Sequence, residues 1–145
     1  MHRKFLIISA ISGFICVLLG AFGAHTLKKL ITPDQLAAFE TGVRYQFYHS
    51  LALIAVSVLL SIIGDNAFLK RAGYFFITGI IFFSGSLYFL STQNTLNANL
   101  NWLGPVTPIG GLCFMIGWMM LLLYAFKNKH WSYYLFFLTI FHDIY

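Results

Sequence analysis

The chain has 145 residues, of which 59% are hydrophobic and only 9% are charged, and its formal net charge is +5. This length suits one domain, and a typical soluble domain carries about 25% charged residues, so the composition excludes an ordinary water-soluble protein. The basic residues occur in scattered pairs and form no run, which argues against nucleic acid as a partner. The partner that the composition predicts is the lipid bilayer.

A first membrane span is predicted after a short basic head. The head ends at Lys4 and is followed by twenty residues without formal charge, Phe5–Ala24. A helix of that length spans about 30 Å, the thickness of the hydrocarbon layer. A secretory signal peptide has a similar basic head but an apolar core of only about 7–15 residues. Cleavage after Gly23 is therefore the lesser alternative.

An amphipathic segment follows the first span. Thr32 and Gln35 have the spacing of a helix-capping box, and Pro33 suits the first helical position. Apolar side chains then recur at helical spacing up to a second predicted span, Phe47–Gly64. We expect the segment to lie at the membrane interface or against the other helices. Gly42 could bend its junction with the second span.

Two further spans complete the predicted bundle. Ala72–Ser91 is uncharged, and so is Pro108–Phe126, where Thr107 repeats the pattern of a cap before proline. The sequence therefore predicts an all-α fold, an integral membrane four-helix bundle with an amphipathic segment between spans 1 and 2. We expect the transmembrane domain to cover residues 1–126. The aromatic C-terminal tail, 127–145, is predicted to lie at the membrane interface.

Glycines inside the spans are candidates for close helix packing. A glycine has no side chain, so it lets the backbone of a neighbouring helix approach, and small residues are enriched at helix contacts in membranes. We expect this role for Gly13, Gly20, Gly23, Gly85, Gly110, Gly111 and Gly117.

The basic residues also predict the orientation of the bundle. Four spans place both ends of the chain on one side of the membrane. That side carries six basic residues, Arg3, Lys4, Lys70, Arg71, Lys127 and Lys129. The other side carries three, Lys28, Lys29 and Arg44, which two acidic residues offset. Because basic loops stay in the cytoplasm, we predict that both termini are cytoplasmic.

One group of polar side chains forms the candidate site, and its members are His25, Glu40, Arg44, Tyr45 and His49. Ionisable groups inside a membrane are costly, so they are functional hypotheses by default. His25 ends the first span and His49 begins the second, so we expect both near one face of the membrane. Two imidazoles at similar depth could bind haem or a divalent metal, or relay a proton.

Simpler interpretations of the same residues are favoured. Isolated histidines without a motif spacing are more often hydrogen-bonding residues than ligands, so we expect no resident cofactor or metal. Glu40 and Arg44 lie four residues apart and most simply form a salt bridge. A pocket for an anionic headgroup, a quinone or a small polar ligand is the alternative.

Four motifs occur together in one order along the chain. They are Gly20–His25, Tyr45–Leu53, Phe83–Tyr88, and Thr107–Leu112 with the nearby Gly117-Trp118 pair. In this combination the chain resembles the family of small integral membrane proteins known as domain of unknown function 423. The resemblance implies a four-helix protein of the bacterial inner membrane, with relatives in animal mitochondria. It implies no particular activity.

The sequence favours a non-enzymatic protein. It contains no nucleophile motif, phosphate-binding loop, CxxC pair or dinucleotide fingerprint. We expect an accessory or scaffold protein of the inner membrane, whose small-residue faces pack on a second copy or in a larger complex. The alternative is a small-ligand binding or transport protein with a polar pocket at the outer-leaflet end of spans 1 and 2.

Overall fold

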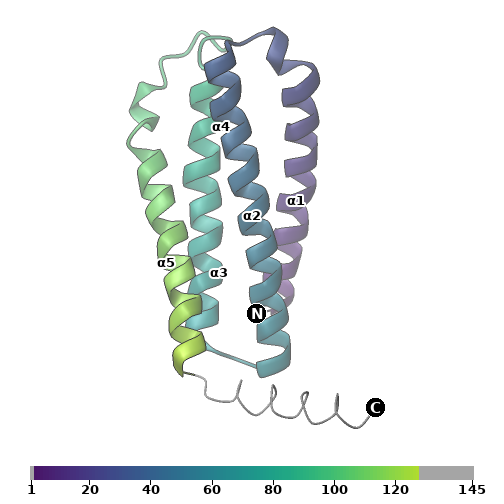
Figure 1. Cartoon of the computed structure of the whole chain (residues 1–145), viewed down its shortest axis with the longest axis vertical. Helices are drawn as coiled ribbons and strands as arrows, with labels where there is room; N and C mark the ends of the chain where they lie inside the picture. The colour runs from purple at the N-terminus through teal and green to yellow at the C-terminus, as the bar shows by residue number, and fades with distance from the viewer. Residues whose placement is uncertain (1, 128–145) are drawn as a thin grey trace, which may run out of the picture.

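The computed structural model describes residues 2–127, and within that range it contains helices and loops only. Four of its helical segments are long and apolar enough to cross a bilayer, His2–Lys29, Pro33–Ile63, Ala67–Thr92 and Asn101–Lys127. They lie side by side, and the N-terminus and the end of the last helix are at the same end of the bundle (Figure 1). The predicted all-α four-helix membrane fold is confirmed. The predicted interfacial tail lies beyond the described residues, except for Lys127.

The bundle is built from eight helical elements in the described range. In chain order these are α1 (His2–His25), the short 3₁₀-helix η1 (Leu27–Lys29), α2 (Pro33–Ile63), α3 (Ala67–Gly79), the π-helix η2 (Ile80–Ser84), α4 (Gly85–Thr92), the 3₁₀-helix η3 (Asn101–Leu103) and α5 (Val106–Lys127). α3, η2 and α4 follow one another without a break and make up the third span. α1 packs mainly on α2, and α5 packs on α3 and η2.

α2 begins at the predicted capping box. Thr32 Oγ1 accepts a hydrogen bond from the Gln35 backbone nitrogen at 3.3 Å, and Gln35 Oε1 accepts from the Thr32 nitrogen at 3.0 Å. The helix then continues for 31 residues, about 46 Å, well beyond the bilayer thickness. The amphipathic segment is therefore the first part of α2 and not a separate element. Gly42 lies inside this continuous helix, where a Cβ would lie 2.9 Å from the Tyr88 ring.

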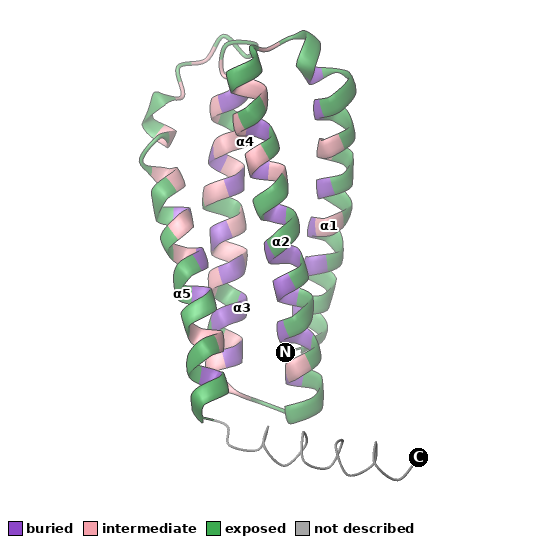
Figure 2. Cartoon of the chain, viewed as in Figure 1, coloured by how far each residue is buried: buried purple, intermediate pink, exposed green. Residues whose placement is uncertain are grey.

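The buried faces of the helices are richer in small and polar residues than the exposed faces. On α1 the buried residues are Phe5, Ser9, Ser12, Cys16 and Gly23. Large aliphatic side chains such as Ile11 and Val17 are instead 55% and 68% exposed. The buried positions face neighbouring helices and the exposed ones face outward (Figure 2). This arrangement is expected in lipid, which solvates aliphatic side chains as well as another helix does.

The predicted packing glycines fall into three groups. A Cβ at Gly110 would collide with the backbone of Phe83, one at Gly117 would lie 2.6 Å from the Phe76 ring, and one at Gly23 would lie 3.1 Å from the Phe39 ring. Gly20 and Gly111 lie at ordinary contact distance from their neighbours, at 3.8 Å. At Gly13 and Gly85 no atom lies within 4 Å, so these two do not mark a close contact within the chain.

Candidate functional site

His49 lies midway along α2, where it is only 5% exposed. Its Nδ1 is 2.7 Å from the backbone oxygen of Tyr45, and its Nε2 is 3.2 Å from the indole Nε1 of Trp118 on α5. An indole N–H can only donate, so Nε2 accepts that hydrogen bond and Nδ1 carries the ring proton. His49 is therefore a neutral imidazole, and both of its nitrogens already have partners.

Aromatic rings surround this imidazole. The His49 ring stacks on Phe114 with the two centroids 3.5 Å apart and the planes 8° from parallel. Phe76 and Trp118 approach it from other sides, at 5.6 and 6.2 Å between centroids. Aromatic stacking and a satisfied pair of hydrogen bonds both hold the ring in place. His49 thus joins α2 to α5 in the middle of the bundle.

His25 does not lie near His49. Ser50, the residue after His49, donates from its Oγ to Ser12 Oγ at 2.7 Å, which places His49 level with Ser12 of α1. His25 is the exposed last residue of α1, thirteen residues beyond Ser12, or about 20 Å along the axis. The expectation of similar depth is wrong because α2 starts at Pro33 and carries His49 deep into the bundle. These two imidazoles cannot share one haem or metal ion.

Glu40 and Arg44 do not form the expected salt bridge. The Arg44 guanidinium donates from Nη2 to Thr41 Oγ1 at 3.0 Å, and both charged side chains are exposed. Within residues 2–127 the ion pair that forms is Lys70–Asp65, at 2.8 Å in the loop between α2 and α3. Arg44 therefore has a hydroxyl group as its partner in place of the expected carboxylate, and the Glu40 carboxylate has no ion-pair partner in the described part of the chain.

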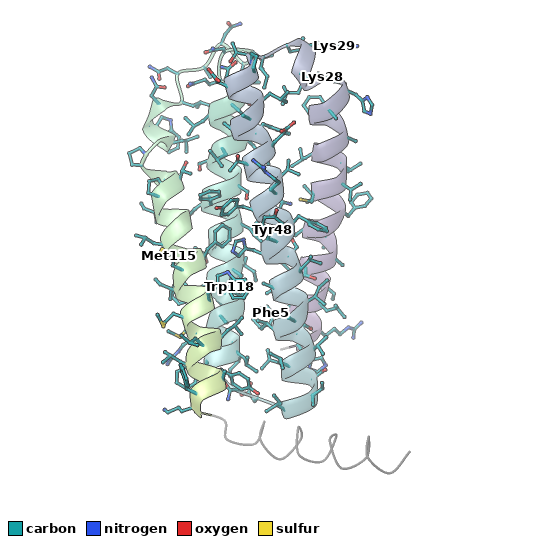
Figure 3. The ribbon with its side chains drawn as sticks, in the orientation of Figure 1. Phe5, Lys28, Lys29, Tyr48, Met115 and Trp118 are labelled. Atoms are coloured by element: carbon teal, nitrogen blue, oxygen red, sulfur yellow. The ribbon has the colours of Figure 1, made fainter. Side chains whose placement is uncertain are left out.

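A groove of about 870 Å³ runs between α2 and α5 beside His49. Its aromatic lining consists of Tyr45, Tyr48, Phe83, Phe114 and Trp118, and its other lining residues are His49, Pro108, Gly111, Leu112 and Met115. Figure 3 labels Tyr48 on α2 and Met115 and Trp118 on α5, which border it. Of the five candidate residues the groove brings together Tyr45 and His49. It lies between α2 and α5 at mid-height, and not at the outer end of the first two spans as expected.

A buried hydrogen-bond network centred on Gln46 was not predicted. Gln46 is 4% exposed, its Nε2 donates to the Ser12 backbone oxygen at 2.9 Å, and its Oε1 accepts from the Tyr88 hydroxyl at 2.8 Å. One side chain thereby links α1, α2 and α4. Residue spacing could have indicated Gln46, because it lies three residues before His49 and therefore on the same face of α2.

Comparison with known proteins agrees with this architecture. The family described as "Protein of unknown function (DUF423)" matches residues 19–111. The chain is 41% identical over 129 residues to a UPF0382 membrane protein of Haemophilus influenzae, which covers 89% of this chain and 98% of that protein. It is 40% identical over 125 residues to the UPF0382 membrane protein YwdK of Bacillus subtilis, with 86% of this chain and 98% of that protein covered.

A third relative carries a location in its name. The chain is 38% identical over 127 residues to the UPF0382 inner membrane protein YgdD of Escherichia coli, with 88% of this chain and 92% of that protein covered. No solved structure matches the chain. The family match and the relatives confirm the resemblance seen in the four motifs, and this chain belongs to the DUF423 family of membrane proteins of unknown function.

Proposed function

We propose that this protein binds a flat, lipid-soluble molecule with hydrogen-bond acceptors, of the quinone class, in the groove between α2 and α5. One observation carries the proposal. The hydroxyls of Tyr45 and Tyr48, which line the groove, have no hydrogen-bond partner among residues 2–127. A hydroxyl without a partner is costly in hydrocarbon, and a ligand carbonyl would accept from it.

Tyr45 and Tyr48 both lie near the middle of α2, far from either end of the helix. Tyr45 and Tyr48 follow Pro33 by twelve and fifteen residues, which places them about 18 and 22 Å along a helix of about 46 Å. Both side chains therefore leave the helix near the middle of the bilayer, where lipid tails offer no hydrogen-bond acceptor to the hydroxyls. Their rings are 6.3 Å apart between centroids, so both can reach one ligand.

The walls of the groove suit a planar ring. Tyr45 and Phe83 are 4.6 Å apart between centroids, and Phe114 lies next to both. Aromatic pairs of this kind add about 0.5–1.5 kcal/mol beyond the burial of their area. The volume of about 870 Å³ exceeds that of a single ring, so it leaves room for an apolar tail. His49 would present a ring edge and not a ligand nitrogen, because both nitrogens are engaged.

Quinone binding is tested by fluorescence in lipid nanodiscs. A short-chain benzoquinone is added to a Trp102→Phe/Trp131→Phe variant, in which Trp118 is the remaining fluorophore. We expect saturable quenching, and we expect Tyr45→Phe and Tyr48→Phe each to weaken binding about two- to tenfold through the loss of one hydrogen bond. Tyr124→Phe, the same chemical change on α5 outside the groove, should bind as before. Quenching that never saturates, or an unchanged Kd in the double Tyr45→Phe/Tyr48→Phe variant, would reject the proposal.

We also propose that the protein lies in the bacterial inner membrane with both termini in the cytoplasm. Lys127 lies 5.1 Å from the Phe68 ring, which supports one basic end that combines the start of α3 with the end of α5. Orientation is tested with single cysteines in a Cys16→Ser/Cys113→Ser background. A membrane-impermeant maleimide should label Asn97→Cys in intact cells, and Asp65→Cys only after permeabilisation. The reverse pattern would place the termini outside.

A scaffold or accessory role is the second candidate function. It is favoured by Glu40 and Arg44, two exposed charges on a membrane-spanning helix. Such charges call for a protein neighbour in the bilayer. This role is compatible with ligand binding, because the groove has its own lining between α2 and α5.

A further inference from the structure

Glu40 and Arg44 carry charges that residues 2–127 do not neutralise. They lie one turn apart on α2 and both are exposed. Arg44 donates to the Thr41 hydroxyl, and Glu40 has no ion pair or hydrogen bond among residues 2–127. The Glu40 carboxylate and the remaining N–H groups of the Arg44 guanidinium therefore still need partners.

The predicted first span places both charges inside the apolar layer. Cys16 Sγ donates to the Val43 backbone oxygen at 3.0 Å, so Arg44 is level with Cys16 on α1. Cys16 precedes Ala24, the end of the predicted first span, by eight residues, so the Arg44 backbone lies about 12 Å inside the hydrocarbon. Glu40 is four residues nearer the surface, at about 6 Å. Lipid tails cannot compensate either group.

The surface around these charges is hollowed. A cavity of about 180 Å³ lies beside Gly20 and Gly23 of α1, and another of about 320 Å³ lies beside Val17 of α1 and Phe47 of α2. Both cavities border Val43 and Arg44, so they lie next to each other between α1 and α2. The walls of both cavities are mostly apolar.

We infer that the α1–α2 face is the interface for a second copy of this chain, in which Glu40 pairs with the partner's Arg44 and Arg44 with the partner's Glu40. Two copies in one membrane have the same orientation, so a two-fold axis along the membrane normal brings this face against itself. The Arg44 guanidinium extends along α2 to the Thr41 hydroxyl, one residue from the height of Glu40. In the two-fold dimer the partner's Glu40 lies at that same height in the membrane.

Charge complementarity selects a second copy over a lipid. The reciprocal pairs neutralise four charges in the dimer and leave no net charge at the interface. An anionic lipid headgroup would neutralise Arg44 and would leave the Glu40 carboxylate uncompensated or repelled. The inference does not depend on quinone binding, since Glu40 and Arg44 do not line the α2–α5 groove.

The dimer is tested by energy transfer between labelled copies in phosphatidylcholine vesicles. We expect the native protein to dimerise, and Glu40→Arg and Arg44→Glu each to raise the dissociation constant about tenfold or more, because like charges then face each other. The double variant Glu40→Arg/Arg44→Glu is again self-complementary and should return to within about threefold of the native value. It should not pair with the native chain. Asp65→Lys/Lys70→Asp, which swaps the ion pair in the α2–α3 loop, should leave the dimer unchanged.

A cross-linking measurement tests the same interface with Glu40 and Arg44 unchanged, so it does not depend on whether the charge variants fold. In the Cys16→Ser/Cys113→Ser background, Val17→Cys should form a disulfide between copies, and Leu112→Cys, which is exposed on α5, should not. A native protein that stays monomeric in vesicles, or cross-links only at position 112, would overturn the inference. An Arg44→Glu defect that requires phosphatidylglycerol would identify an anionic lipid as the partner and would overturn it as well. Quinone binding by the charge-swap variants is unaffected in each case, which separates this test from that of the groove.

Discussion

Replacing Gly110 with leucine is expected to destabilise the folded bundle by about 3 kcal/mol. A Cβ at Gly110 would collide with the backbone nitrogen and Cα of Phe83, which lies in the π-helix η2. Backbone atoms cannot rotate aside as the end of a side chain can, so α5 and η2 would have to separate. The measurement is unfolding in mixed micelles with increasing SDS, followed by circular dichroism. The leucine variant should unfold at a clearly lower SDS fraction than the native protein.

Gly85 provides the matched control for this substitution. Gly85 is also a glycine within a membrane span, since it begins α4 in the third span. No atom lies within 4 Å of the position that a Cβ would take there. Gly85→Leu should leave stability unchanged or raise it by up to about 1 kcal/mol, because leucine is a better helix former than glycine. Equal unfolding curves for the Gly110→Leu variant and the native protein would show that close packing of Gly110 on Phe83 does not stabilise the bundle.

The spans could be predicted from sequence because their signals are local. A run of apolar residues long enough to cross the bilayer predicts a membrane helix, whichever helices pack against it. The first span, Phe5–Ala24, became α1 over His2–His25, and the capping box at Thr32 and Gln35 begins α2. Each of these features depends on a few consecutive residues, so each is fully present in the sequence.

The inner face of α2 was harder to predict because lipid reverses the usual hydrophobic pattern. In water the most apolar stripe of a helix faces the core, whereas in lipid that stripe loses nothing by facing outward. Leu51 and Val58 are 49% and 47% exposed, and the polar residues Gln46, Ser50 and Ser57 are buried. A search for polar and small residues at spacings of three and four would have identified this buried face.

The candidate site was only partly predicted for a related reason. His49 and Tyr45 do line one groove, but their partners Trp118, Phe114 and Phe83 come from other spans. Contacts between spans depend on helix register and rotation, which local sequence does not encode. His25 seemed to be a neighbour of His49 because the second span was predicted to begin only at Phe47, which placed His49 at the start of that span. The continuous α2 instead moves His49 to mid-depth.

Replacing Gln46 with methionine is expected to destabilise the bundle by about 2 kcal/mol, and adding Tyr88→Phe is expected to recover part of that loss. Methionine has a similar size but cannot accept from the Tyr88 hydroxyl or donate to the Ser12 carbonyl. The Tyr88 hydroxyl would then lack a partner in an apolar interior, which costs about 1–3 kcal/mol. Removing that hydroxyl as well replaces a broken polar pair with an apolar contact, which is nearly neutral.

The same SDS titration measures this double-mutant cycle. We expect a coupling free energy of about 1 kcal/mol between positions 46 and 88, within the range measured for hydrogen bonds between membrane helices. Tyr88→Phe alone should be milder than Gln46→Met, because it breaks one of the two hydrogen bonds that the Gln46 side chain forms. If the effects of the two substitutions simply add, the Gln46 side chain does not depend on Tyr88. The contact between α2 and α4 would then rest on packing around Gly42, where the Tyr88 ring approaches the α2 backbone.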